Sequence, residues 1–132
     1  MSKQLNIVGI GASAGGLDAI QQLFDHLPAN TGMAFVIVQH LSPDFKSLMA
    51  ELLAKHTKMK IYTAEDKMSV KPNCVYLNPR NKNLHIKGDK LYLLDKGPKR
   101  NLNLPIDIFF HTLGEEKKHE SIGVILSGTG SD

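Results

Sequence analysis

The sequence predicts a doubly wound α/β domain, a three-layer arrangement in which a mainly parallel sheet has helices on both faces. Short apolar runs rich in β-branched residues are typical of strands buried on both sides. These runs alternate with helical periodicity over short connections, as strand–helix–strand units do. A Gly-Asp pair between two further apolar runs adds an antiparallel hairpin inserted into this pattern.

The first half of the chain alternates strand and helix patterns. The apolar run at 5–10 predicts a buried strand that ends at glycines. A helix follows, with Pro28 beyond its end, and residues 34–38 predict a second strand. A turn signal at 42–44 precedes a second helix, and residues 61–64 predict a third strand. The apolar residues that define the two helices are Leu17, Ile20, Leu23 and Phe24, then Leu48, Met49, Leu52 and Leu53.

The middle of the chain has a different pattern, with short strands predicted at 75–77, 84–86 and 91–94. The last two are separated by Lys87-Gly88-Asp89-Lys90. A Gly-Asp pair between apolar runs favours a two-residue turn, so these two strands are expected to form an antiparallel hairpin.

The last third of the chain predicts one more helix and one more strand. After a polar loop at 96–103, Pro105 suits the first position of a helix that carries Ile106, Phe109, Phe110 and Leu113. The run 122–126 predicts a buried strand, and the sequence ends in the loop that follows it. We therefore expect residues 1–132 to form one domain that is incomplete at its C-terminus.

Composition excludes several classes of protein. A chain of 132 residues and 14.6 kDa, with 42% hydrophobic and 22% charged residues, is typical of one ordinary globular domain. No apolar run approaches the roughly 20 residues of a membrane helix, and no secretion signal opens the sequence. The single cysteine, Cys74, excludes an internal disulfide and a multi-cysteine metal site. We expect a cytoplasmic protein without cofactor, metal or membrane insertion.

The charge balance gives no reason to expect a nucleic-acid partner. The net charge is +3, and six lysines lie between residues 46 and 71, counting both ends. No aromatic residues interleave with these lysines in a pattern that would stack on bases. Solvated lysine faces are therefore the expected structure.

The glycine loop after the first strand fits two functional patterns. Residues 9–14 match the dinucleotide fingerprint G-x-G-x-x-G/A, and residues 11–15 match the nucleophile elbow G-x-S-x-G. A dinucleotide site needs an acidic residue at the end of the second strand, to bind a ribose hydroxyl. That strand ends instead in Gln39 and His40, which favours the elbow around Ser13.

The elbow interpretation gives a candidate catalytic triad at the carboxyl edge of the sheet. Neighbouring strands lie roughly 4.8 Å apart, so groups that follow adjacent strands can reach hydrogen-bond distance. His40 could then take the proton of the Ser13 hydroxyl, and Asp132 could orient the imidazole. The chain order Ser, His, Asp is no objection, because a triad is defined by its geometry.

Each of these residues also has a structural interpretation that the spacing alone leaves open. Ser13 could cap the following helix, His40 could be an ordinary strand-end histidine, and Asp132 could be a turn residue. Cys74 is expected to be a small buried hydrophobe. The other histidines show no ligand spacing and are expected to have no chemistry: His26, His56, His85, His111 and His119.

The motifs together resemble the catalytic domain of the bacterial chemotaxis protein-glutamate methylesterases, the CheB type. The resemblance covers essentially the whole chain in order. It rests on the glycine loop, on the strand that ends in His40 and on the final loop, with two weaker segments between them. The segments are residues 7–16, 38–41, 76–81, 104–107 and 126–132.

This resemblance implies hydrolysis of glutamate γ-methyl esters on the cytoplasmic helices of chemoreceptors, and deamidation of certain receptor glutamines. It implies Ser13 as nucleophile, His40 as base and Asp132 as the triad acid. The backbone N–H groups of Ala14 and Thr129 are then expected to bind the oxyanion.

The family resemblance also bears on regulation and on partners. Family members often carry an N-terminal phosphoacceptor receiver domain, as part of a phosphorelay, and only residues 1–4 precede the first strand here. The motifs look closest to hybrids in which the esterase is joined to a receptor methyltransferase domain. Such a domain, fused or separate, is therefore an expected partner. Two alternatives stay open: a non-catalytic module that binds receptors, and a dinucleotide-binding half-domain.

Overall fold

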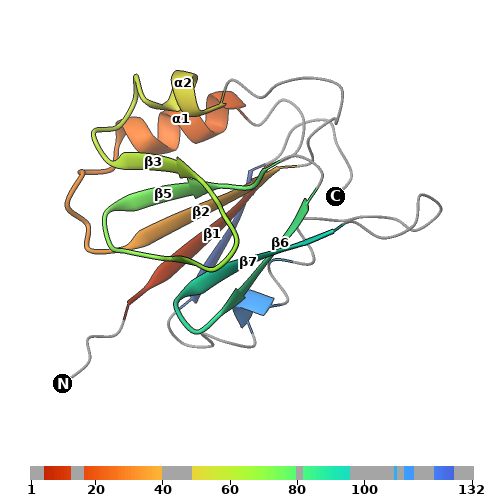
Figure 1. Ribbon diagram of the computed structural model, residues 1–132. Helices are drawn as coiled ribbons and strands as arrows, with labels where there is room; N and C mark the ends of the chain where they lie inside the picture. The colour runs from red at the N-terminus through yellow and green to blue at the C-terminus, as the bar shows by residue number, and fades with distance from the viewer. Residues whose placement is uncertain are drawn as a thin grey trace.

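The computed structural model describes residues 5–12, 17–39, 49–79, 82–95, 109, 112–114 and 121–126. Its main sheet has five parallel strands in the order β3-β5-β2-β1-β8 (Figure 1). These strands are β1 (Ile7–Ala12), β2 (Ala34–Gln39), β3 (Lys60–Thr63), β5 (Cys74–Leu77) and β8 (Ser121–Leu126). A parallel sheet with this crossover order is the predicted doubly wound architecture.

The central strands of the sheet are buried on both faces. All six residues of β1, and the first five residues of β2, are buried. Successive side chains of a strand point to opposite faces, so each strand contributes to two separate cores. In β2, Ala34, Val36 and Val38 pack on one side, and Phe35 and Ile37 pack on the other. This two-sided burial explains the continuous apolar runs in the sequence.

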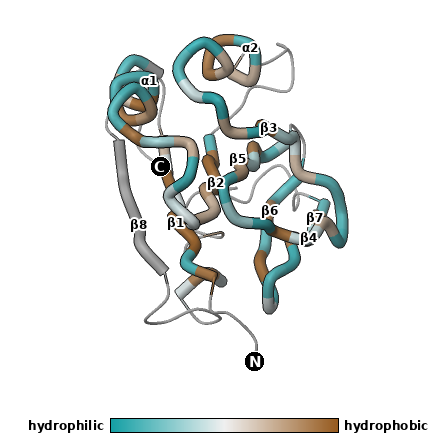
Figure 2. The backbone as a smooth tube through the Cα atoms, turned by 90° about the vertical axis from the view of Figure 1, so that its left-hand side faces the viewer, coloured by the Kyte–Doolittle hydropathy of each residue, from teal (hydrophilic) through white to brown (hydrophobic). Residues whose placement is uncertain are grey.

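Two helices cover one face of the sheet, namely α1 (Leu17–Asp25) and α2 (Met49–Leu53). Figure 2 shows them side by side above the strands. Ile20 and Phe24 of α1 and Leu53 of α2 are fully or almost fully buried against Phe35 of β2. The Phe24 and Phe35 rings meet edge to face, with centroids 5.4 Å apart.

A small antiparallel sheet packs against the other face (Figure 2). It has the order β4-β7-β6 and consists of β4 (Met68–Ser69), β6 (Lys82–Lys87) and β7 (Lys90–Asp95). Leu84, Ile86 and Leu91 are buried in this second core together with Phe109 and Leu113, which are helical. The domain therefore has three layers, with the five-stranded sheet in the middle.

The hairpin was correctly predicted, and its turn has the expected chemistry. The strands β6 and β7 pair in register from Lys87 opposite Lys90 to Lys82 opposite Asp95. Gly88 takes φ +62, a conformation that glycine adopts without steric cost in a two-residue hairpin turn.

Three elements differ from the sequence expectation. The strand at 75–77 was grouped with the hairpin strands, but β5 lies within the main parallel sheet, between β3 and β2. The two-residue strand β4 was not predicted, because its pairing with β7 is a tertiary contact. Most of the helix expected from Pro105 lies outside the described residues, although Phe109 and residues 112–114 are helical.

Candidate active site

Three neighbouring strands of the main sheet end at the same level. Ala12, the last residue of β1, lies opposite Gln39, the last residue of β2. On its other side Ala12 lies opposite Leu126, the last residue of β8. All three strands run parallel, so their carboxyl ends form one edge (Figure 1). In open α/β sheets this is the edge where ligands bind.

The predicted site residues follow these strand ends in the sequence. Ser13 comes directly after β1, His40 comes directly after β2, and Asp132 is in the segment that follows β8. Ser13, His40 and Asp132 lie outside the described residues, as do Ala14 and Thr129. Their catalytic roles stay predictions from the sequence. The described strands β1, β2 and β8 end at one edge of the sheet, and the three predicted residues follow these strands in the sequence.

One described side chain binds the strand end next to His40. Asn78 follows β5, is 6% exposed, and faces the last residue of β2. Its Oδ1 accepts a hydrogen bond from the Gln39 N–H at 2.9 Å, and its Nδ2 donates to the Gln39 carbonyl at 2.8 Å. The Asn78 N–H also donates to the Ile37 carbonyl at 3.3 Å. No role for Asn78 was predicted from the sequence. Its position directly after a strand was the only feature of the sequence that pointed to a contact at the edge of the sheet.

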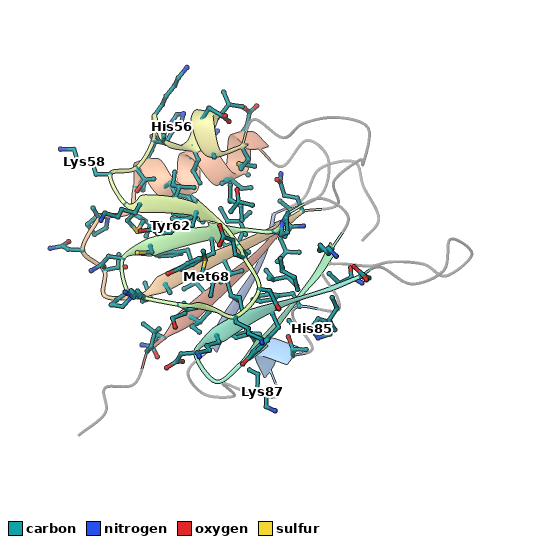
Figure 3. The ribbon with its side chains drawn as sticks, in the orientation of Figure 1. His56, Lys58, Tyr62, Met68, His85 and Lys87 are labelled. Atoms are coloured by element: carbon teal, nitrogen blue, oxygen red, sulfur yellow. The ribbon has the colours of Figure 1, made fainter. Side chains whose placement is uncertain are left out.

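Three histidines, His26, His56 and His85, lie among the described residues. His56 follows α2, and its Nδ1 donates to the Asp25 carboxylate at 2.7 Å. His85 lies on β6, on the opposite side of the main sheet (Figure 3). His26 Nδ1 donates to the Gln22 carbonyl at 2.8 Å. Among the described residues no three His, Cys, Asp or Glu side chains group as metal ligands. That these histidines have no chemistry stays a prediction from the sequence.

Burial shifts the pKa of two described groups. It lowers the pKa of His85 below its usual 6.5, because desolvation disfavours the imidazolium. It raises the pKa of Tyr76 to about 12, because the phenolate would lose its water in the core. The Tyr76 hydroxyl accepts from the Lys71 N–H at 2.9 Å and donates to the Ser69 carbonyl at 3.3 Å. His85 lies on β6 of the small sheet, whereas Tyr76 lies on β5 of the main sheet and packs in the core that the two sheets share.

Two surface hollows are lined by described residues, and neither includes a strand-end residue of β1, β2 or β8. A hollow of about 460 Å³ lies between the ends of α1 and α2 and includes His56 and Lys58. The other, of about 340 Å³, includes Tyr62 and Met68 beside β3 (Figure 3). Cys74 is a free, buried thiol, as predicted. The candidate active site is the carboxyl edge of the sheet, because β1, β2 and β8 end together there.

The fold and the aligned strand ends define a three-layer α/β domain whose candidate site lies at the carboxyl edge of its central strands. The family model for the CheB methylesterase matches residues 8–132. The chain belongs to the CheB methylesterase family. Family membership confirms the resemblance seen in the sequence, and it favours the nucleophile-elbow interpretation of the glycine loop over the dinucleotide one.

Individual relatives agree with this assignment. A protein of Leptospira interrogans, provisionally named a protein-glutamate methylesterase/protein-glutamine glutaminase, is 38% identical over 124 residues, which are 93% of this chain. Protein-glutamate methylesterase/protein-glutamine glutaminase 2 of Xanthomonas oryzae is 35% identical over 96% of the chain. The chain spans 64% of the Leptospira protein and 36% of the Xanthomonas protein.

A solved structure has the same fold. The crystal structure of the Thermotoga maritima CheB methylesterase catalytic domain superposes with a TM-score of 0.82 at 33% sequence identity. The match covers 98% of this chain and 71% of the other. The predicted α/β fold is therefore confirmed. No helix among the described residues has the length and apolar character needed to cross a membrane.

Proposed function

We propose that this chain is the catalytic part of a protein-glutamate methylesterase, in which Ser13 is the nucleophile, His40 the general base and Asp132 the residue that orients His40. Residues 1–132 would then act as one methylesterase-type domain. The observation that carries the proposal is the common level at which β1, β2 and β8 end. The names of the relatives support the reaction type, since both describe enzymes that act on protein glutamate or glutamine side chains.

In the first half of the proposed reaction, the Ser13 Oγ bonds to the γ-carbonyl carbon of a glutamate methyl ester. The His40 imidazole takes the hydroxyl proton as this bond forms. The bond from carbon to methoxide oxygen then breaks, and the same proton passes from His40 to the departing group, which leaves as methanol. The negative oxygen of the tetrahedral intermediate is bound by the backbone N–H groups of Ala14 and Thr129.

In the second half, water attacks the glutamyl ester of Ser13 and gives its proton to His40. The proton passes to the Ser13 Oγ as the ester bond breaks, and the glutamate γ-carboxyl group is released. Asp132 keeps the imidazole in the tautomer that can accept a proton and stabilises its charged form. With a glutamine substrate the same steps release ammonia in place of methanol, which is the proposed glutaminase activity.

The substrates we propose are the methylated cytoplasmic helices of bacterial chemoreceptors, and the proposed location is the cytoplasm. A receptor methyltransferase domain, fused or separate, is the proposed functional counterpart, because it would make the ester that this enzyme cleaves. The support for these partners is membership of the CheB methylesterase family.

Methanol release from a methylated receptor fragment tests the proposal directly. The parent protein is compared with Ser13→Ala, and circular dichroism establishes that both are folded. Release by the parent, and its loss in Ser13→Ala, is the expected result. A folded parent that binds the receptor fragment without releasing methanol would instead indicate a non-catalytic receptor-binding module.

A further inference from the structure

The ladder between β2 and β5 stops two residues before β2 itself ends. The last paired residues are Ile37 and Leu77, whereas β2 continues to Gln39. Each residue of a β-strand directs its N–H and C=O groups to the same side, and the next residue directs its own groups to the opposite side. Ile37 uses its carbonyl on the β5 side, so Gln39 directs its own N–H and C=O to that side as well.

The side chain of Asn78 fills the place of the missing ladder step. Its amide oxygen accepts from the Gln39 N–H at 2.9 Å, and its amide nitrogen donates to the Gln39 carbonyl at 2.8 Å. The orientation of the side-chain amide is fixed, because a backbone N–H can only donate and a carbonyl can only accept. The Asn78 carboxamide thus acts as an additional peptide group at the end of β2.

This contact holds the last peptide unit of β2. The peptide unit between Gln39 and His40 is planar, so the Gln39 carbonyl and the Cα atom of His40 lie in one plane. A hydrogen bond to the Gln39 carbonyl therefore restrains the orientation of this peptide unit. On the other side Gln39 lies opposite Ala12 of β1 in the parallel ladder, so the end of β2 has a neighbour on both sides.

We propose that Asn78 is a positioning residue for His40: its carboxamide holds the last peptide of β2 so that the imidazole can reach the Ser13 hydroxyl. This inference rests on the proposed function. Asn78 is 6% exposed and binds main chain, so it acts through His40 and does not touch substrate. A displacement of about 1 Å at a catalytic group can cost on the order of 100-fold in rate.

The chain offers a matched control at the other end of the same two strands. Asn73 precedes β5, and its Oδ1 accepts from the Gly32 N–H at 2.7 Å, just before β2 begins. Its own N–H donates to the Met33 carbonyl at 2.8 Å. Asn73 has φ +61, which glycine also adopts readily, so Asn73→Gly removes the side-chain bond without backbone strain. This variant loosens β2 at the end away from His40.

The test compares kcat and KM for methanol release in Asn78→Ala, Asn78→Asp and Asn73→Gly, at a temperature well below each unfolding midpoint. The Asn78→Ala change is expected to lower kcat by about 10- to 100-fold and to leave KM within about twofold. Asn73→Gly is expected to keep both constants within about twofold of the parent. A merely structural role would lower the unfolding midpoints of both variants without separating them in kcat.

The Asn78→Asp variant removes only the hydrogen bond to the Gln39 carbonyl. If Asn78→Ala fails to fold, Asn78→Asp takes its place in the comparison. An ionised Asp has nearly the same shape as Asn and can accept from the Gln39 N–H, but it cannot donate to the Gln39 carbonyl. We expect it to lose kcat as Asn78→Ala does. Full activity in Asn78→Asp, or equal kcat in Asn78→Ala and Asn73→Gly, would overturn the inference while leaving the esterase intact. A parent protein with no activity would instead overturn the proposed function.

Discussion

Ala12 and Gln39 lie opposite each other in the parallel ladder of β1 and β2, and each is the last residue of its strand. The next residues in the chain are Ser13 and His40. Because adjacent strands are roughly 4.8 Å apart, the chain leaves the sheet toward these two residues from neighbouring points. This register supports the proposed pairing of Ser13 as nucleophile with His40 as base, and mutation tests that pairing.

Replacement of either member of the serine and histidine pair is expected to remove nearly all activity. Ser13→Ala and His40→Ala should each lower kcat for methanol release by about 10⁴-fold or more. The double variant should be little worse than either single one, because the two groups act as a unit. The control is His26→Ala, which changes a histidine directly after α1 whose Nδ1 bonds the Gln22 carbonyl of that helix. A loss of less than tenfold in His40→Ala would falsify the role of this residue as the base.

The triad acid gives a separate prediction. Asp132→Asn should lower kcat by about 10³- to 10⁴-fold, because an amide cannot hold the imidazole in the correct tautomer or stabilise its charge. Asp95→Asn serves as the comparison, since Asp95 pairs with Lys82 on an exposed part of the small sheet. Steady-state assays of both variants decide the point: equal activity in the two would remove Asp132 from the mechanism.

The contact between α1 and the sheet should dominate stability on the helical face. Phe24 and Phe35 are 1% and 2% exposed, and their rings meet at an interplanar angle of 67°. Phe24→Ala should lower the free energy of unfolding by about 3–5 kcal/mol, through lost burial and the cavity left behind. Urea unfolding measures this, and Leu94→Ala provides the contrast because Leu94 is 50% exposed. A cost below about 1 kcal/mol for Phe24→Ala would mean that α1 does not depend on this contact.

Local sequence signals predicted the alternation of strands and helices in the first half of the chain and the hairpin. The apolar runs of β1 and β2 were readable because burial on both faces leaves no polar positions. The hairpin was readable because its turn is a local Gly88-Asp89 pair. The family was recognised because motifs around Ser13, His40 and Asp132 each followed a predicted strand.

Tertiary pairing was what the sequence did not predict. The run at 75–77 has the same local pattern whether it joins the hairpin or the main sheet, and only its contact with β2 decides between them. The contact of Asn78 with Gln39 spans 39 residues of chain, so neither periodicity nor propensity indicates it. A single polar residue after a strand is consistent with many turns, which is why Asn78 carried no specific signal.

The hydroxyl of Tyr76 makes the stability sensitive to alkaline pH. Its pKa is raised from 10.0 to about 12 in the folded protein, so between these values the unfolded chain loses the proton first. Stability is therefore expected to fall as pH rises from 10 toward 12. Tyr76→Phe should cost about 1 kcal/mol at pH 8, by removing the bonds to Lys71 and Ser69, and should lose less between pH 8 and pH 11 than the parent. Urea unfolding at both values tests this, with Tyr92→Phe as the control; parallel losses in all three proteins would contradict it.

The imidazole of His85 should act in the opposite direction, at acidic pH. Burial holds the pKa of His85 below 6.5 in the folded protein, where the ring lies on β6 opposite Tyr92 of β7. Below about pH 6.5 the unfolded chain therefore binds a proton that the folded protein takes up less readily, and stability falls as pH falls. His85→Gln removes this titration, so its urea midpoint should drop less between pH 7.5 and pH 5 than that of the parent. An equal drop in His85→Gln and in the parent would mean that the acid sensitivity of the fold comes from groups other than this half-buried ring.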